Sequence, residues 1–269
     1  MTAKLKFGLP RFWAMLGAGF MVNTAALSQM LVHPVVVEFG ARQPAATVRV
    51  SLSDTAKAPM RLQAELMRWE QDLQGEDRVS PGNDLLVTPP IADLQPGGTQ
   101  LFRVALRGPR AAPEEIAYRL ILEDIAEPPA AVLENAPPGY VAVNFRMRYD
   151  LPVMVAPTGK IMNSLRWKPC PADAAKALKA ASAVNPGASS NEACMRLLNS
   201  GNRRVKVRTL TLAGDGWQQA LPLKESVNIL AGAEREWLIP LQPGQTGAMR
   251  GVQVQTVRGE TLQAEAGGF

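Results

Sequence analysis

Histidine and cysteine are scarce in this chain: one histidine and two cysteines occur in 269 residues, and only 6% of the residues are aromatic. This scarcity excludes a histidine-rich metal centre and a zinc site with four cysteine ligands. It also argues against an enzyme that relies on histidine chemistry, and no cluster of carboxylates replaces it. We therefore expect no catalytic residues, no metal and no cofactor.

The net charge of the chain is also small. The chain has 29 lysines and arginines against 24 acidic residues, which gives a net charge of +5. Three of the basic residues, Lys4, Lys6 and Arg11, lie at the N-terminus, so the remainder carries about +2, or 26 basic against 24 acidic residues. Without a basic stripe interleaved with stacking aromatics, we expect no nucleic-acid partner.

The N-terminus has the pattern of a secretory signal peptide. A basic start precedes an apolar run, Phe12 to Val22, and Ala26-Leu27-Ser28 offers small residues for cleavage before Gln29, with cleavage after Ala26 as the alternative. An uncleaved anchor is the other interpretation, but the run is shorter than the ~20 residues that span a bilayer. We assign residues 1–28 to the signal and expect an exported protein without stable membrane insertion.

Export determines the expected redox state of Cys170 and Cys194. In an oxidising compartment two lone cysteines are expected to pair, and the bridge would enclose 23 residues. A closed loop of that size stabilises the fold by about 3 kcal/mol in the chain-entropy model. Inside it, a helix is expected over 174–184, with Asp173 as its N-cap. The C-x-x-C spacing of a redox-active site is absent, so the bridge is predicted to be structural.

Short alternating strands and turn signals account for most of the remaining sequence. In residues 46–53, Val48, Val50 and Leu52 fall on one face and polar residues on the other. Regularly spaced strands of this kind predict an all-β protein of two β-sandwich domains. We place them at residues 29–155 and 156–269, with the Cys170–Cys194 segment as an insertion in the second.

Several segments resemble, in order, the periplasmic pilus chaperones of the PapD-like family. The most specific is the block PP-I-x-x-L-x-P-G-x-x-Q-x-x-R-V at 89–104, which sets a proline corner, a turn and a strand in one register. The others are VHPVVVEF (32–39), ATVRVSLSD (46–54), LQAELMRWEQ (62–71), EEIAYRLILEDI (114–125), NFRMRYDLPVMVAP (144–157), LRWKP (165–169) and LLNSGNRRVKVRTLTL (197–212). Within the family, the archaic branch, which serves spore-coat-like subunits, is the most similar.

The resemblance implies two immunoglobulin-like domains set at an angle, like a boomerang, in a periplasmic protein. Such a chaperone lends the final strand of its first domain to an incomplete pilus or fimbrial subunit, a mode known as donor-strand complementation. It then delivers the subunit to an outer-membrane usher, and no energy source is implied. The expected partners are therefore subunits and an usher.

The strand expected to be lent begins at Tyr140. Val141, Val143, Phe145 and Met147 alternate with polar or small residues, so they form one apolar row. Strand addition needs such a row, because alternate side chains enter pockets while the backbone supplies hydrogen bonds. The alternative is that the row faces the chain's own core, as most alternating strands do.

The resemblance also implies a pair of basic residues that hold the subunit's C-terminal carboxylate. At the positions where the best-known members carry arginine and lysine, this chain has Val36 and Pro152. The remaining candidates are Arg119 and Arg148, on strands expected to be adjacent, with Arg146 as a substitute if the register differs. The alternative is that both arginines are solvated surface residues.

A second function stays open at this point: an exported two-domain β-sandwich that is itself a structural or adhesion component of a surface fibre. A fibre subunit should carry an N-terminal extension to donate to its neighbour. Only Gln29 to Leu31 separate the expected cleavage site from the first strand, which favours the chaperone.

Overall fold

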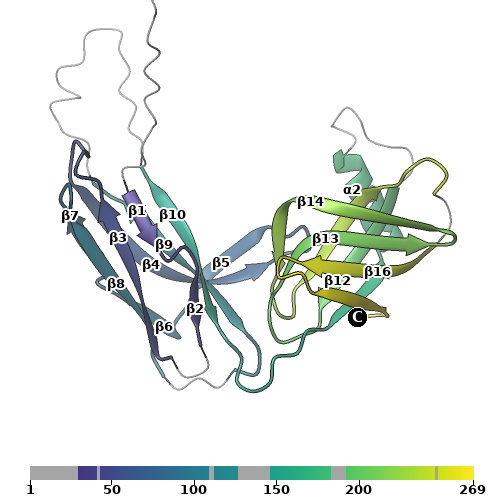
Figure 1. The fold of residues 1–269 in the computed structure, drawn as a ribbon, viewed down its shortest axis with the longest axis horizontal. Coiled ribbons are helices and arrows are strands. Elements are labelled where there is room, and N and C mark those ends of the chain that lie inside the picture. Colours follow the sequence, from purple (N-terminus) through teal and green to yellow (C-terminus); the bar gives the residue numbers. More distant parts are fainter. Residues whose placement is uncertain (1–29, 41–42, 109–111, 127–145, 183–191, 246–247) are drawn as a thin grey trace, which may run out of the picture.

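The computed structural model describes residues 30–40, 43–108, 112–126, 146–182, 192–245 and 248–269. Two β-sandwich domains form nearly all of it, as predicted, and Figure 1 shows them set at an angle with the β4–β5 hairpin between them. The expected signal peptide, 1–28, lies outside the described residues. Among the described residues, no helix is long and apolar enough to cross a bilayer.

The first sandwich has two sheets. The smaller has the strand order β1-β3-β8-β6, and the larger has the order β2-β10-β9-β4-β5, with β7 pairing with β4. Their bounds are β1 Met30–His33, β2 Val37–Phe39, β3 Ala45–Leu52, β4 Met60–Gln71, β5 Asp77–Pro81, β6 Leu85–Thr88, β7 Ile91–Leu94, β8 Thr99–Leu106, β9 Ile116–Asp124 and β10 Arg148–Val155.

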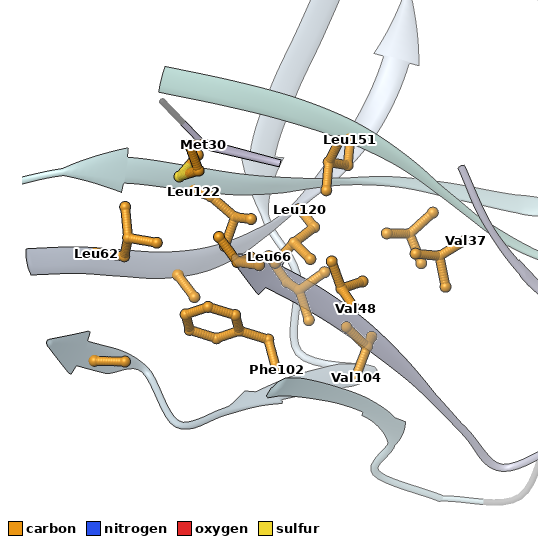
Figure 2. Packing of buried hydrophobic residues seen from close by; sticks show 14 of the residues in the cluster. Met30, Val37, Val48, Leu62, Leu66, Phe102, Val104, Leu120, Leu122 and Leu151 are labelled. Carbon is orange, nitrogen blue, oxygen red and sulfur yellow. The ribbon is translucent and has the colours of Figure 1, made fainter. Parts of the chain in front are cut away.

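Alternating apolar residues from both sheets form the core of this sandwich. Val48, Val50 and Leu52 of β3 are buried, as their period-two spacing predicts. Figure 2 shows Phe102 of β8 between the sheets, with Leu62 and Leu66 of β4 nearby. Burying each such side chain stabilises the fold by about 1.5–3 kcal/mol.

The second sandwich consists of seven strands in the order β14-β13-β16-β17-β11-β12-β15. It has a core of its own, in which Trp167, Leu197 and Leu210 are buried. The bounds are β11 Leu165–Pro169, β12 Glu192–Asn199, β13 Val205–Gly214, β14 Trp217–Ile229, β15 Glu234–Pro240, β16 Met249–Thr256 and β17 Thr261–Ala266.

A disulfide joins Cys170 to Cys194, which confirms the predicted pairing. Within the segment that it closes, helix α2 spans Ala172–Ser182, two residues earlier than predicted at its start. Asp173 is therefore not the N-cap. It lies in the first turn, where its charge favours the positive end of the helix dipole.

Asn199, at the end of β12, ties three segments of the second domain together. Its side chain is fully buried, and its Nδ2 lies 2.8, 3.0 and 3.1 Å from the carbonyl oxygens of Arg203, Ile229 and Leu230. Its Oδ1 accepts a hydrogen bond from the Gly201 amide at 3.1 Å. A buried polar group with several partners is costly to remove, because the partners lose their hydrogen bonds without gaining water.

We expect Asn199→Ala to lower the free energy of unfolding by about 3 kcal/mol, because buried carbonyls are left without a donor. Denaturant unfolding of the variant measures this loss. Asn163→Ala is the matched control, since Asn163 is exposed and its change should cost less than about 0.5 kcal/mol. Equal losses in the two variants would contradict the structural role of Asn199.

Candidate functional site

The outer face of the larger sheet in the first sandwich turns toward the second domain. Trp69, Ala117 and Met154 lie on this face and pack against Leu230 of the second domain. Beside them, a cleft of about 420 Å³ is lined by 68–71, 112–117 and 230–233. The cleft and the face next to it are where a partner could contact both domains.

Arg119 of β9 lies in a row of apolar residues on this face. It pairs with Pro152 of β10 on one side and with Met67 of β4 on the other. Val36 directly precedes Val37, which pairs with Val153, so Val36 lies at the level of Pro152. Directly paired residues point to the same side of a sheet. Arg119 is thus adjacent to Pro152 and lies one strand further from Val36, the two positions where the family's basic pair was expected but is missing.

The guanidinium of Arg119 is held by two neighbours. It lies over the ring of Trp69, 3.7 Å from the ring centroid, and it donates to Oδ2 of Asp77. The Trp69 Nε1 group donates to Oδ1 of the same carboxylate at 2.7 Å. The side chain of Arg119 is only 16% exposed, so it is not the solvated surface arginine of the alternative interpretation.

Arg148, the other candidate, lies at the start of β10. Its side chain is about half exposed and forms ion pairs with Glu123 at 3.7 Å and Asp150 at 3.3 Å. It shares a face with Arg119, and their strands are adjacent. Pro152, the partner of Arg119, lies four positions further along β10, which corresponds to about 13 Å. The two arginines therefore do not form one close pair.

Of the strand expected to be lent, Val141, Val143 and Phe145 lie outside the described residues. Met147 is described, and its side chain is 45% exposed just before β10. Leu151, Val153 and Val155 continue the same alternation and are buried in the core of the first sandwich. The apolar row thus faces the chain's own core within β10 and leaves it at Met147.

An ionic cluster around one buried carboxylate joins the domains where β9 begins. Glu115, just before β9, has a side chain only 3% exposed, and its Oε2 accepts from Arg204 at 2.6 Å. Glu38 of β2 also pairs with Arg204, and Arg203 approaches Glu115 at 3.8 Å. Burial raises the pKa of Glu115. Burial also acts to raise the pKa of Glu38, but Arg204, Arg203 and Arg258 together outweigh it, so the pKa of Glu38 is lowered.

The β4–β5 hairpin supplies a third contact between the domains. The Leu73 carbonyl accepts from the Glu236 amide of β15 at 2.7 Å. Gln71 bonds to the Leu230 amide at 3.0 Å and to the Asn228 carbonyl at 3.1 Å. Gly75 has a φ of +81°, and the Arg235 guanidinium occupies the space where a Cβ would lie. Only glycine meets both demands at this position.

The family resemblance made Arg119 a candidate, whereas neither the resemblance nor the sequence pattern singled out Asp77 or Glu115. Their partners are 42 and 89 residues away in the chain, and nothing local distinguishes these two carboxylates from other acidic residues. Opposite charges in the segments around Glu115 and Arg204 were the only available signal.

Comparison with known proteins agrees with this architecture. Residues 29–160 match the family model described as pili and flagellar-assembly chaperone, PapD N-terminal domain. A search of curated proteins found no match.

Solved structures extend the likeness over both domains. One is the CsuC–CsuE chaperone–tip adhesion subunit pre-assembly complex from archaic chaperone-usher Csu pili of Acinetobacter baumannii, with a TM-score of 0.59 and 16% identity over 90% of this chain and 100% of that chain. Another is the class 5 fimbriae chaperone CfaA, with a TM-score of 0.56 and 13% identity over 89% and 100%. At these identities the likeness shows the fold.

The two β-sandwich domains, together with the family match of the first, define a two-domain pilus-assembly chaperone. The chain belongs to the PapD-like family of pilus-assembly chaperones, which confirms the resemblance inferred from its sequence.

We expect Glu115→Gln to weaken the contact between the domains and to lower the free energy of unfolding by about 3 kcal/mol, because the mostly buried Arg204 then keeps only Glu38 as its counter-ion. Urea unfolding measures the loss, and small-angle scattering measures the spread of domain orientations. Glu114→Gln is the matched control, since Glu114 is exposed and forms no ion pair with the described residues. Identical unfolding curves for the two variants would show that Glu115 does not hold the domains together.

Proposed function

We propose that this chaperone captures pilus subunits in the periplasm by lending them residues 140–147, and that it passes them to an outer-membrane usher. The observation that carries the proposal is the exposed end of β10. Met147 leaves the sandwich in the same alternation as the buried Leu151 and Val153. An apolar row that continues past its own core is suited to completing another sandwich.

The comparisons support the choice of partner. Two of the similar structures are complexes of a chaperone with a tip subunit or tip adhesin, one of them from archaic pili and the other associated with CFA/I fimbriae. We infer that this chain also binds fimbrial subunits, of the spore-coat-like kind served by the archaic branch. Its role is binding and delivery without catalysis.

Three further assignments belong to the same proposal. Residues 1–28 direct export and are removed, residues 29–155 form the domain that lends its strand, and residues 156–269 form the second domain. The proposed boundary after residue 155 coincides with the end of β10, and β11 begins at Leu165.

Of the two candidate anchors, Arg119 has the stronger support. It lies beside Pro152 and at the level of Val36, in a row that is otherwise apolar. A mostly buried guanidinium binds a carboxylate more strongly than an exposed one, because less water competes for its donors. Arg148 is half exposed and already has two acidic neighbours, so we assign it a secondary role.

Phe145→Asp should leave the fold intact and abolish subunit capture, because a charge cannot enter an apolar pocket without a partner. The measurement is affinity purification of the tagged protein from the periplasm of its own host, followed by mass spectrometry. Asn144→Asp adds the same charge on the opposite face of the strand and should still capture subunits. Undiminished capture by the Phe145 variant would remove this strand from the mechanism.

Arg119→Met should reduce the recovery of subunits at least about tenfold, because a buried carboxylate loses its charged donor. Arg148→Met, in the same assay, should reduce it far less. Circular dichroism must show that both variants remain folded. A larger loss for the Arg148 variant would reverse the assignment of the anchor.

A further inference from the structure

Two donors bind one carboxylate at the outer face of the larger sheet. The Trp69 indole N–H and the Arg119 guanidinium each take one oxygen of Asp77, so both oxygens are engaged. Trp69 is buried and Arg119 is mostly buried, which leaves these donors few alternatives to a carboxylate. The pair therefore has the chemistry of a carboxylate receptor, with an acid of the same chain already bound.

The receptor is also rigid. The guanidinium lies 3.7 Å from the centroid of the Trp69 ring, so the ring covers one of its faces and leaves the donor edge available. Asp77 differs from its two partners in exposure. Its side chain is 42% exposed, and every residue of β5 is exposed. The donors are fixed, whereas the acceptor lies at the solvent-facing rim.

We propose that Asp77 is an internal occupant of the carboxylate site, and that the carboxylate of a bound subunit displaces it from Arg119 and Trp69. The inference rests on the proposed function, since it assumes that Arg119 receives the subunit's C-terminus. It adds a residue that determines which groups the site accepts. Only a ligand that carries a negative charge can replace the Asp77 carboxylate as the counter-ion of Arg119, so a neutral chain end is rejected.

The displaced carboxylate has a partner within reach of the hairpin. Arg235 of β15 packs over Gly75 in the β4–β5 turn, two residues before Asp77. Its Nε is buried and has no hydrogen-bond partner within the described part of the chain. Burial lowers the pKa of Arg235, and Asp77 is one of three nearby carboxylates whose charge opposes that change. A shift of Asp77 toward Arg235 would give an under-paired cation a counter-ion.

An internal competitor weakens ligand binding by the fraction of molecules in which the site is free. If Asp77 occupies the site in about nine molecules out of ten, its removal lowers the dissociation constant for a carboxylate about tenfold. Asp77→Asn tests this directly, because it removes the charge and keeps an oxygen that can accept from Trp69. Asp77→Ser is a second neutral variant, to be used if the amide variant does not fold.

The probes are N-acetylalanine, which has the free carboxylate of a chain end, and N-acetylalaninamide, which is neutral. The readout is the Trp69 indole signal in a ¹H–¹⁵N spectrum, assigned from its loss in Trp69→Phe. We expect N-acetylalanine to shift this signal in both proteins, with a dissociation constant about tenfold lower for Asp77→Asn than for the wild type. Glu76→Gln removes the neighbouring exposed charge and should titrate like the wild type. The neutral probe should shift nothing.

Three results would overturn the inference. Equal dissociation constants for the wild type and Asp77→Asn would show that Arg119 binds carboxylates without competition from Asp77. An equal response to the neutral probe would remove the charge selectivity. No response to N-acetylalanine in either protein would reject Arg119 as a carboxylate receptor, whereas subunit capture through the lent strand would still be decided separately by Phe145→Asp.

Discussion

The orientation of the two sandwiches depends on one buried carboxylate. Glu115 is held between Arg203 and Arg204 of the second domain, and its side chain is almost fully removed from water. A buried charge of this kind is tolerated only while its counter-ions stay in place. Any rotation that separates the domains therefore raises the free energy, because it leaves a buried carboxylate unpaired. The contact of Trp69, Ala117 and Met154 with Leu230 lies on the same side of the first domain. The ionic cluster and this apolar contact together keep one sheet face turned toward the second domain.

That face explains why Arg119 needs a partner at all times. Pro152 and Met67 flank it in the sheet, and Trp69 covers one side of its guanidinium. An arginine in such surroundings brings a positive charge and five N–H donors, and it has no acceptor of its own. Its donors must therefore find a carboxylate within the protein or from a ligand. In the free chaperone Asp77 meets that requirement, which accounts for an ion pair that the strand pattern alone does not demand.

Local sequence patterns predicted the features that neighbouring residues decide, such as which face of a strand is buried. The alternation in β3 placed Val48 and Val50 in a core, and export predicted the Cys170–Cys194 bridge. The helix in that segment was misplaced by two residues, because an acidic residue stabilises the first helical turn as well as the position before it. Asp77 and Glu115 were beyond reach, since their partners follow from strand order and domain orientation. Arg119 became a candidate only through the family resemblance, and its support comes from the register of three strands.

The β4–β5 hairpin connects the binding face with the domain contact, because the same short segment takes part in both. Leu73 bonds to β15 across the interface, and Asp77, four residues later, bonds to Arg119 within the first domain. A chaperone of the proposed kind must bind a subunit firmly and still give it up to an usher. That is achieved most easily when each group released by the subunit finds a replacement partner in the chaperone, since no buried charge is then left unpaired. When the subunit leaves, Asp77 is available to pair with Arg119 again. While the subunit is bound, Arg235 is available to pair with Asp77.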